Sequence, residues 1–509
     1  MVVVLVGVLI GCIDTEPPGQ GPRRSPPTGG PAQPQDPQEP QDPQEQPSES
    51  ALADSRFWVG PAEIVAGPAK YVDSNFNAIK IGDTVRGYSG NRHTYLFEGS
   101  SVADLVATGR RVIEAGDDPD VWDDCGAWLK GVERDDENPR LLRAWYHAEW
   151  QCNYAIDQTN KSIAYAESRD GGRTFVKVGY PDNQVIRSSL PFVESQRNGR
   201  GDFTVIRRDG YYYIYYLNVL ADEKTVTSVA RSPVSSGGVP GTWHNYTVDE
   251  DGRGSWTEDA LGGDAAALDT IIPVGSASIH QPSGEVMLAR QHPKSGGIVL
   301  QTSADGLHFT PLPEPLVPIL DSQMREGWGT STEGQIVGYV SVMAADGSRR
   351  WSDEFYLFHM YVFPGDELFA NRYLVRRRVV IEDGPPEGPR SLVALASYVG
   401  AGGDRFATSA PERSGTPDGV VGYLLTAGDG RRRLFECRSA DGTDRFVSGE
   451  CGDVPTKDRM VGYALVEQQP GTVALYRCES SAGDQFASLD EECEGGRTVA
   501  EVGFVYPPA

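Results

Sequence analysis

A recurring order of short β-runs is the feature that most constrains the fold of residues 60–385. In residues 202–216 one β-run leads through Asp209-Gly210 into an aromatic β-run, which is the pattern of a tight β-hairpin. Two further β-runs follow within residues 227–247. Similar orders of runs occur in residues 68–115, 141–175, 285–310 and 317–380. Five units of roughly 60 residues, each with four short strands, predict a five-bladed β-propeller.

A different repeat occupies the C-terminal part of the chain. Three segments place a phenylalanine two residues after an aspartate, and the aspartates (Asp404, Asp444 and Asp484) follow one another at intervals of 40 residues. An apolar β-run precedes each segment, and Gly-Tyr or Gly-Phe follows it. Three such repeats predict a β-trefoil. We therefore expect an all-β chain, with the propeller over residues 56–386 and a β-trefoil of three repeats over residues 387–509.

The N-terminal residues indicate export rather than a folded domain. Residues 1–12 are apolar and match the central region of a signal peptide, and Leu9-Ile10-Gly11-Cys12 resembles the bacterial lipobox, in which the cysteine is lipidated. The alternative is a truncated secretory signal whose Cys12 is incidental. Residues 13–55 are rich in Pro, Gln and acidic residues, and are predicted to be a disordered linker. These features predict an exported lipoprotein of the cell envelope, facing the periplasm or the exterior, with no membrane-spanning helix.

Charge and cysteine content limit the partners and the metals. Acidic residues outnumber basic ones 72 to 46 in 509 residues, so the net charge of -26 argues against a nucleic-acid partner. Six cysteines besides Cys12 allow 15 disulfide connectivities, and no C-x-x-C pair suggests zinc. Proximity favours the pairs Cys125–Cys152, Cys437–Cys451 and Cys478–Cys493. We expect a monomer without metal or organic cofactor, and a structural calcium ion in the propeller channel remains an alternative.

Two motifs carry a resemblance to known families. Ser168-Arg-Asp-Gly-Gly-Arg-Thr-Phe175 resembles the Asp-box turn of sialidases, and Asp202 with the later Asp-Gly-Tyr-Tyr-Tyr resembles the blade opening of five-bladed furan-glycosidases such as arabinanases, xylosidases and invertases. This resemblance implies a glycoside hydrolase acting on a polysaccharide, for example a furanoside such as arabinan. The C-terminal repeat resembles lectin-like modules of secreted bacterial hydrolases and implies a carbohydrate-binding role. The alternative is a non-catalytic glycan-binding or adhesive surface protein.

Four carboxylates are candidates for the reaction, and the register of the predicted blades selects three of them. Asp73, Asp124 and Asp202 fall where the innermost strands of the first three blades begin, and Glu149 ends an aromatic β-run two residues after His147. Glycoside hydrolysis needs two carboxyl groups, one that donates a proton and one that acts as base or nucleophile. The resemblance implies three acids from successive blades. We expect Asp73 to be the base or nucleophile, Asp124 to tune the pKa of its partner, and Glu149 or Asp202 to be the acid.

Each candidate also has a structural interpretation. The aspartates could cap turns, Glu149 could pair with Arg143 on its own strand, and tryptophans in a blade are commonly core residues. The further candidates for contact with a sugar are His147, Trp122, Trp145 and Trp328 in the propeller, and Asp404, Asp444 and Asp484 in the C-terminal repeats.

The lipobox gives a first testable prediction. A Cys12→Ser variant cannot be lipidated, so we expect it to move from the membrane fraction to the soluble fraction when cells are fractionated. Unchanged membrane association of this variant would contradict the lipoprotein interpretation.

Overall fold

The computed structural model describes most of the chain from residue 50 onward, and residues from Pro47 form one compact unit. Cys12, the predicted signal peptide, Trp328 and Asp444 lie outside the described residues. The described ranges are 50–118, 121–268, 275–292, 297–318, 334–383, 388–428, 430–438, 445–449, 451 and 459–508. Within these ranges the chain is all-β, as predicted: strands alternate with short 3₁₀ helices only, and no helix is long and apolar enough to cross a membrane.

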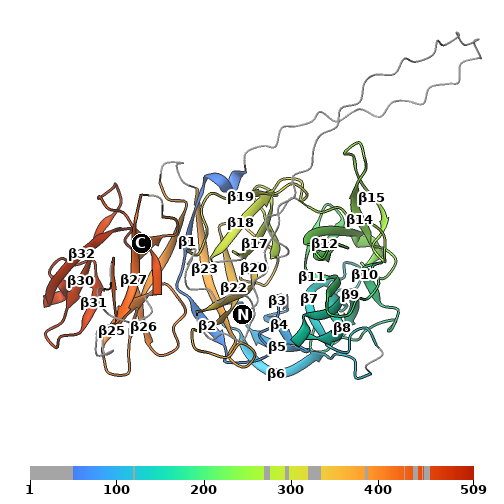
Figure 1. Ribbon diagram of the computed structural model, residues 1–509, viewed down its shortest axis with the longest axis horizontal. Coiled ribbons are helices and arrows are strands. Elements are labelled where there is room, and N and C mark those ends of the chain that lie inside the picture. Colours follow the sequence, from blue (N-terminus) through green and yellow to red (C-terminus); the bar gives the residue numbers. More distant parts are fainter. Residues whose placement is uncertain are drawn as a thin grey trace, which may run out of the picture. The chain divides into compact units, whose positions relative to one another are not determined.

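Four antiparallel strands form each of the first four blades (Figure 1). Blade one consists of β3 (Asn77–Ile81), β4 (Thr84–Asn91), β5 (His93–Gly99) and β6 (Val106–Ile113), and blade two of β7 (Gly126–Arg134), β8 (Leu142–Asn153), β9 (Gln158–Ser168) and β10 (Gln184–Arg187). Blade three consists of β11 (Arg197–Arg208), β12 (Tyr211–Val219), β13 (Thr225–Pro233) and β14 (His244–Val248), extended by β15 (Gly254–Asp259). Blade four consists of β16 (Ser276–His280), β17 (Val286–Gln291), β18 (Ile298–Ser303) and β19 (Thr310–Pro311).

The fifth blade combines the two ends of the propeller sequence. Its inner strands are β20 (Ile336–Met343), β22 (Glu354–Val362) and β23 (Tyr373–Asp383), while the short β21 (Arg350–Trp351) pairs with β16. The N-terminal strands β1 (Ser55–Val59) and β2 (Glu63–Ala66) both pair antiparallel with β23. The fold begins before the predicted boundary at residue 56, because η1 (Ala51–Asp54) already buries Leu52 in the core. The pairing of β1 and β2 with β23 therefore closes the ring through backbone hydrogen bonds.

Five hydrophobic clusters close the sheets into a ring. Each cluster lies between one blade and the next, because it takes buried side chains from both: Leu96 with Leu129, Ile163 with Phe203, Val229 with Ala277, Met287 with Val342, and Phe76 with Phe358. The last pair stacks with ring centroids 4.7 Å apart and joins blade one to blade five. The five-bladed β-propeller predicted from the repeat is therefore confirmed.

The C-terminal repeat forms three three-stranded units. In each unit the first strand pairs antiparallel with both strands that follow it. The units are β24 (Ser391–Val399), β25 (Arg405–Thr408) and β26 (Thr416–Leu425); β27 (Arg432–Arg438), β28 (Arg445–Ser448) and β29 (Arg459–Ala464); and β30 (Val473–Glu479), β31 (Gln485–Ser488) and β32 (Arg497–Val505). Cys437–Cys451 and Cys478–Cys493 are disulfides in the second and third units, as predicted. The β-trefoil assignment itself stays a prediction.

A cyclic set of cation–π contacts links the three units. Arg445 lies over Phe406 at 3.8 Å, Arg477 over Phe446 at 3.7 Å and Arg405 over Phe486 at 5.0 Å. All three phenylalanines are buried. The repeated phenylalanine is therefore a core residue that receives an arginine from another unit, which explains why it recurs in the sequence.

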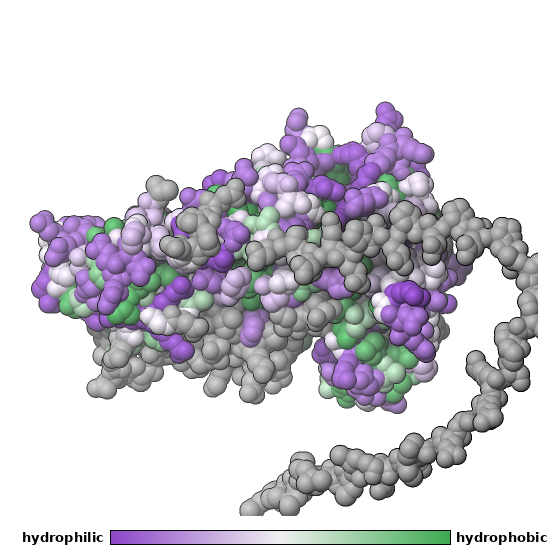
Figure 2. All heavy atoms as spheres, turned by 90° about the horizontal axis from the view of Figure 1, so that it is seen from above, coloured by the Kyte–Doolittle hydropathy of each residue, from purple (hydrophilic) through white to green (hydrophobic). Residues whose placement is uncertain are grey.

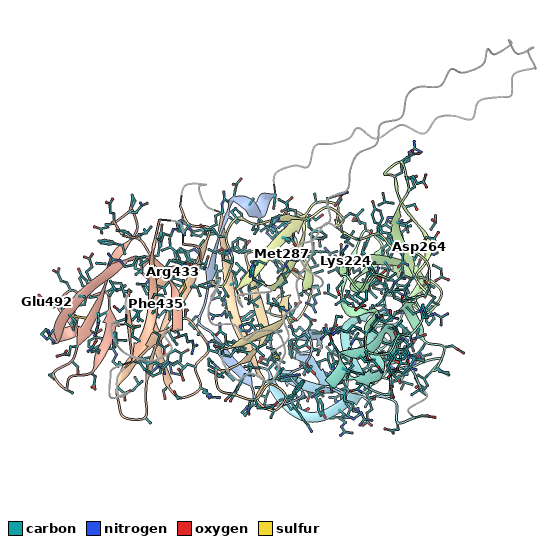
Figure 3. All side chains as sticks on the ribbon, viewed as in Figure 1. Lys224, Asp264, Met287, Arg433, Phe435 and Glu492 are labelled. Atoms are coloured by element: carbon teal, nitrogen blue, oxygen red, sulfur yellow. A yellow bond between two sulfur atoms is a disulfide. The ribbon has the colours of Figure 1, made fainter. Side chains whose placement is uncertain are left out.

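The C-terminal repeat shares a core with the propeller. Strand β1 pairs parallel with β24 while it pairs antiparallel with β23. One cluster unites Met287 of blade four, Val375 of blade five and Leu395 of β24, and Met287 lies among the strands in Figure 3. On the face shown in Figure 2 hydrophilic residues predominate between small apolar patches. The two repeat regions are therefore joined through a continuous apolar interior.

This shared core gives a stability prediction. Leu395→Ala removes a fully buried side chain from the joint cluster. We expect it to lower the free energy of unfolding by about 2–5 kcal/mol, measured by chemical denaturation. Val248→Ala, at an exposed position, is the control and should change stability by less than about 0.5 kcal/mol. Equal effects of the two substitutions would show that β24 does not belong to the common core.

Candidate active site

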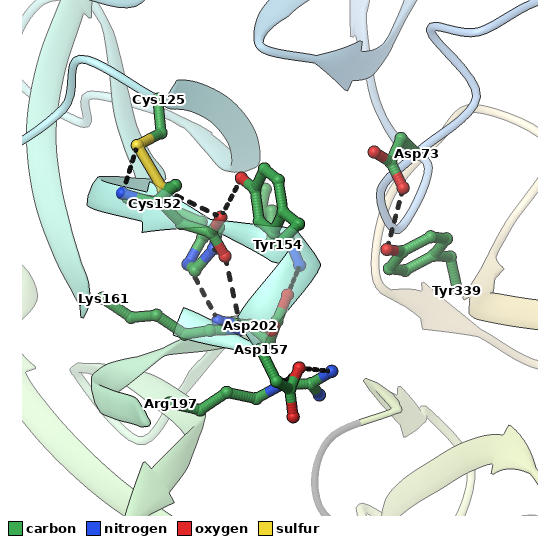
Figure 4. A network of polar contacts seen from close by, with 12 residues as sticks. Asp73, Cys125, Cys152, Tyr154, Asp157, Lys161, Arg197, Asp202 and Tyr339 are labelled. Atoms are coloured by element: carbon green, nitrogen blue, oxygen red, sulfur yellow. Dashed lines mark hydrogen bonds and ion pairs between the residues drawn. A yellow bond between two sulfur atoms is a disulfide. The ribbon is translucent and has the colours of Figure 1, made fainter. Parts of the chain in front are cut away.

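Three of the predicted carboxylates come from the first three blades and interact with one another. Asp73 lies in the loop before β3, where its backbone N–H donates to the Gly90 carbonyl at 2.9 Å. Glu149 lies on β8, and Asp202 lies on β11 at a bulge. The charge of Glu149 acts on Asp73, and that of Asp202 acts on Glu149. The blade register had selected Asp73 and Asp202, whereas Glu149 was a candidate because it ends an aromatic β-run of the second blade; Figure 4 shows Asp73 across from the group that contains Asp202.

Two buried lysines hold Asp202. Lys130 Nζ on β7 and Lys161 Nζ on β9 each lie 2.8 Å from one carboxylate oxygen of Asp202. Burial alone would raise the pKa of Asp202, but the two ammonium groups outweigh it and hold the pKa well below its ordinary value. Asp202 is thus held in its carboxylate form, with a lysine bound to each of its oxygens. This arrangement does not support the role of proton donor that the sequence had allowed for it.

Glu149 is held as a carboxylate by three groups. One oxygen lies 3.0 Å from His147 Nε2 and 3.3 Å from Lys161 Nζ, and the other accepts a 2.6 Å hydrogen bond from Tyr154 of η2 (Tyr154–Ile156). Burial of Glu149 opposes ionisation, yet Lys161 and His147 outweigh it and lower the pKa to about 2. At neutral pH Glu149 is therefore held in its carboxylate form, which is the form that a base or nucleophile needs. The alternative ion pair with Arg143 is wrong, because Arg143 binds Asp135.

His147 connects Asp202 to Glu149 in a defined tautomer. The backbone N–H of Asp202 donates to His147 Nδ1 at 3.0 Å, so Nδ1 is the acceptor and the ring proton of a neutral imidazole sits on Nε2, facing Glu149. A side chain at Gly201 would meet the imidazole, because an added Cβ would lie 2.4 Å from His147. His147 is 3% exposed, so it is too buried to contact a sugar. It instead fixes the side chain of Glu149 and the backbone of Asp202 through its two ring nitrogens.

Asp73 has the opposite electrostatic character. Its carboxylate accepts a 2.9 Å hydrogen bond from the Tyr339 hydroxyl and pairs with Arg372. Burial raises the pKa of Asp73 although Arg372 and Tyr339 act in the other direction, and the nearby Glu149 charge adds to the rise. Asp73 is thus the member of the group that takes up a proton most easily. The expectation that Asp73 is the base or nucleophile is not supported by this arrangement.

Two residues of this site have a strained backbone conformation. Asp202 has a φ of 42° and Tyr339 a φ of 53°, each at a β-bulge in an innermost strand. A positive φ is costly for residues with a side chain and persists where the surroundings fix it. Asp73, Glu149, Asp202 and the side chains bound to them form one cluster, the acid group. The bulges turn the side chains of Asp202 and Tyr339 into this cluster, where Lys130 and Lys161 bind Asp202 and Asp73 binds Tyr339.

Asp124 lies beside this group without joining it. Its polar partners are the backbone groups of Cys125 and Gln151, and burial raises its pKa. Cys125 and Cys152 form the predicted disulfide, and the Cys125 backbone N–H donates to the Glu149 carbonyl at 3.0 Å. The fully buried acid of this loop is Asp123, which binds Lys177 at 2.5 Å. The local turn directs Asp123 inward onto Lys177 and Asp124 toward the disulfide.

The residues predicted to contact a sugar differ in how far they are exposed to solvent. Trp145 is fully buried and its indole N–H donates to the Gly238 carbonyl, so it is a core residue and its prediction as a sugar contact is wrong. Trp122 is partly exposed and lines a surface cavity. Asp404 and Asp484 are partly exposed and sit in tight turns, with backbone bonds from Gly400 to Asp404 and from Ser480 to Asp484. Their role in ligand binding stays a prediction.

Five further residues of the site were missed: Lys130, Lys161, Tyr154, Tyr339 and Arg372. A signal was present for Lys130, because it interrupts a β-run that is otherwise apolar or small; Lys161 follows polar residues, and both lysines are buried. A charged side chain at an inward position of a strand requires a partner. Nothing comparable distinguished Tyr339 or Arg372, because they come from the distant fifth blade.

The acid group does not fit a calcium ion. Calcium binds six to eight oxygen ligands, whereas the oxygens of Asp202 and Glu149 are already bound by Lys130, Lys161, His147 and Tyr154. Across the described ranges of the chain, no group of three or more His, Cys, Asp or Glu residues is placed to hold a metal ion.

Comparison with known proteins gives a likeness of structure only. No protein-family model and no curated protein matches the chain. Similar solved structures include a GH43_1 enzyme from Xanthomonas citri, with 13% identity, a TM-score of 0.40, and coverage of 64% of this chain and 92% of that one. An α-L-arabinofuranosidase from Podospora anserina has 11% identity, a TM-score of 0.40, and coverage of 66% and 100%. An endo-arabinase from Bacteroides thetaiotaomicron has 11% identity, a TM-score of 0.36, and coverage of 63% and 99%. At these scores the likeness carries no argument on the reaction, and the five-bladed architecture rests on the sheets and core clusters.

The low pKa of Glu149 gives a prediction on pH and stability. Its pKa falls from an ordinary 4.5 to about 2 on folding, so ionised Glu149 stabilises the fold above pH 4.5, and this contribution is lost as the pH falls toward 2. The full contribution is about 3 kcal/mol. We expect Glu149→Gln to flatten the fall in unfolding free energy between about pH 5 and pH 3.

The matched control is Glu467→Gln, at an exposed glutamate outside the acid group. Its pH dependence should follow that of the wild type. If Glu149→Gln also retains the wild-type slope, Glu149 is not held ionised by Lys161 and His147.

Proposed function

We propose that the chain is a glycoside hydrolase whose reaction takes place between Asp73 and Glu149. One observation carries this proposal: two interacting carboxyl groups on different blades have opposite pKa shifts, with Asp73 raised and Glu149 lowered to about 2. Glycosidic cleavage needs one carboxyl group that donates a proton to the leaving oxygen and one carboxylate that attacks the sugar or activates water. Groups with opposed pKa values supply both forms at the same pH.

The residues around the pair have distinct tasks in this proposal. Asp73 gives its proton to the leaving oxygen, and Arg372 and Tyr339 stabilise the carboxylate that results. Glu149 is the base or nucleophile, with Lys161, His147 and Tyr154 fixing its two oxygens. Asp202 holds Lys161 in place and is a positioning residue. These roles exchange the assignment that the sequence had suggested for Asp73 and Glu149.

The substrate and setting are also part of the proposal. The resemblance of the blade opening to furan-glycosidases favours a polysaccharide such as an arabinan as substrate. The C-terminal repeats act as a carbohydrate-binding module, and the shared core with the propeller keeps the two regions on one substrate chain. We infer that the protein is exported, anchored through Cys12 and active as a monomer at the cell envelope.

A non-catalytic glycan-binding protein is the second candidate. It is favoured by the charge balance of the acid group, since the carboxylates Asp73, Glu149 and Asp202 bind the cations Arg372, Lys161 and Lys130. A neutral buried network can be a purely structural feature. An assay for the release of reducing ends from a panel of polysaccharides separates the two candidates, because only the hydrolase releases them.

The proposed roles predict different responses to the leaving group. We expect Asp73→Asn and Glu149→Gln each to lower polysaccharide turnover by about 10²–10⁴-fold. On an arabinofuranoside with a dinitrophenyl leaving group, which departs without a proton, Asp73→Asn should recover most of its activity while Glu149→Gln should not. Turnover is followed by dinitrophenolate absorbance.

Asp251→Asn is the matched control, because Asp251 forms an exposed ion pair with Arg253 and contacts none of the residues that bind Asp73, Glu149 or Asp202. It should retain wild-type turnover. Recovery of Glu149→Gln instead of Asp73→Asn would return the acid role to Glu149. A folded wild type that releases no reducing ends from any glycan would favour the binding protein.

A further inference from the structure

A cavity of about 640 Å³ lies beside the acid group and includes none of its residues. Trp122, Trp150, Asn160, Gln184 and Arg187 supply its large side chains, and the remaining lining residues are serines, leucines and a glycine. Among the described residues that line it, none is acidic. An opening that presents an arginine and no carboxylate is unusual in a chain with a net charge of -26.

The cavity and the acid group share two strands but use opposite faces. Glu149 on β8 is the direct partner of Lys161 on β9, and the next pair along the same strands is Trp150 with Asn160. Successive residues of a strand point to opposite faces of the sheet. Trp150 and Asn160 are therefore directed away from the face on which Glu149 and Lys161 bind each other. A substitution in the cavity can be made without removing a side chain from the acid group.

Trp122 and Trp150 give the cavity two partly exposed aromatic walls. Trp122 is fixed, because its indole N–H donates to the Pro181 carbonyl at 2.8 Å and its ring stacks on Tyr146 at 6.1 Å. An indole that is held in place and still faces a cavity offers apolar surface at little cost in conformational entropy. Such surface suits the C–H faces of a sugar ring.

Polar groups of the cavity suit the edge of the same ring. The side chain of Asn160 forms no hydrogen bond within the described part of the chain, and Gln184 donates its amide hydrogen to Ser162 at 3.0 Å, which leaves its carbonyl oxygen as an acceptor. Amide groups of this kind donate to and accept from hydroxyl groups. The combination of a stacking face with a few orienting polar groups is typical of a small-molecule site.

Arg187 adds a charge that neutral sugars do not require. Its backbone is fixed by a hydrogen bond to the Ala260 carbonyl at 3.1 Å and by one from Arg200 at 3.2 Å, yet within the described residues its guanidinium forms no ion pair. The side chain is exposed at the cavity wall. A guanidinium binds a carboxylate through two parallel hydrogen bonds. The best complement to this wall is therefore a carboxylate attached to a sugar ring.

We propose that this cavity is a separate binding site for a uronic acid residue of a glycan, with the ring between Trp122 and Trp150 and the carboxylate on Arg187. The proposal rests on the proposed function only in taking the ligand to be a glycan. It favours polysaccharides that carry acidic sugars over a neutral arabinan as substrates, and it places recognition of the acidic sugar outside the reacting centre.

A matched pair of oligosaccharides tests the proposal. Xylotriose bearing one glucuronic acid and plain xylotriose differ only in the acidic sugar, and their binding to the full chain is measured by ligand-observed NMR titration. We expect the acidic oligosaccharide to bind at least about 5-fold more tightly, and this difference to shrink in 0.5 M salt because the ion pair is screened. Equal affinities for the two ligands, or binding of neither, would overturn the proposal.

Variants assign the binding to the cavity. Arg187→Gln should remove the preference for the acidic ligand, and Trp150→Ala should weaken both ligands, with Trp150→Phe recovering part of the loss if the alanine variant is unstable. Arg110→Gln, at an exposed arginine of β6, is the matched control and should bind as the wild type does. Retention of the acid preference in Arg187→Gln would overturn the assignment.

The same titration keeps this inference distinct from the proposed function. In Asp73→Asn the cavity is intact, so the acidic ligand should bind with wild-type affinity even though hydrolysis is lost. Binding by the cavity without hydrolysis of any glycan would remove the proposed reaction and leave this site standing. Hydrolysis with no contribution from Arg187 would do the reverse.

Discussion

The candidate site depends on the ion pairs that Lys161 forms with Glu149 and Asp202. Its ammonium group lies 3.3 Å from Glu149 and 2.8 Å from Asp202, and all three side chains are largely removed from water. Two carboxylates this close would repel one another and would bind protons if no cation stood between them. Asp202 in turn needs Lys130, and its strained backbone conformation persists because the lysines fix its side chain. Removal of Lys161 would therefore disturb the charge state of Glu149 and the geometry of β11 together, since breaking a buried ion pair leaves an unpaired charge.

The ring that brings these blades together depends on a strand from the other end of the propeller. Strand β1 completes blade five by pairing with β23, and its other edge carries β24 of the C-terminal repeats. Arg372, which precedes β23, pairs with Asp73 of blade one. Closure of the ring therefore also places Arg372 against Asp73. The cyclic contacts of Arg445, Arg477 and Arg405 with the repeated phenylalanines close the C-terminal part in a comparable way.

Periodicity in the sequence predicted the blades and the three C-terminal units, because each of these features follows from residues within a single repeat. It also selected Asp73 and Asp202 as equivalent positions of different blades, and both belong to the candidate site. It failed where the outcome depends on side-chain direction or on distant blades. Trp145 looked available for a sugar, but its strand position directs it into the core between blades two and three. Asp124 was selected rather than Asp123 because a one-residue difference in a turn reverses which side chain is buried. Tyr339 and Arg372 had no local signal, since only closure of the ring places them against Asp73.

The exchange of roles between Asp73 and Glu149 follows from the unequal distribution of cations. Glu149 has Lys161 and the Nε2–H of His147 on one oxygen and the Tyr154 hydroxyl on the other, so its carboxylate form is stabilised from three directions. Asp73 is less fully buried than Glu149, it has one cation, Arg372, and it also feels the negative charge of Glu149. The ionised state of Glu149 therefore favours the protonated state of Asp73 through their mutual repulsion. In this chain an acid and a base can arise from similar carboxyl groups because the lysines gather on one side of the site.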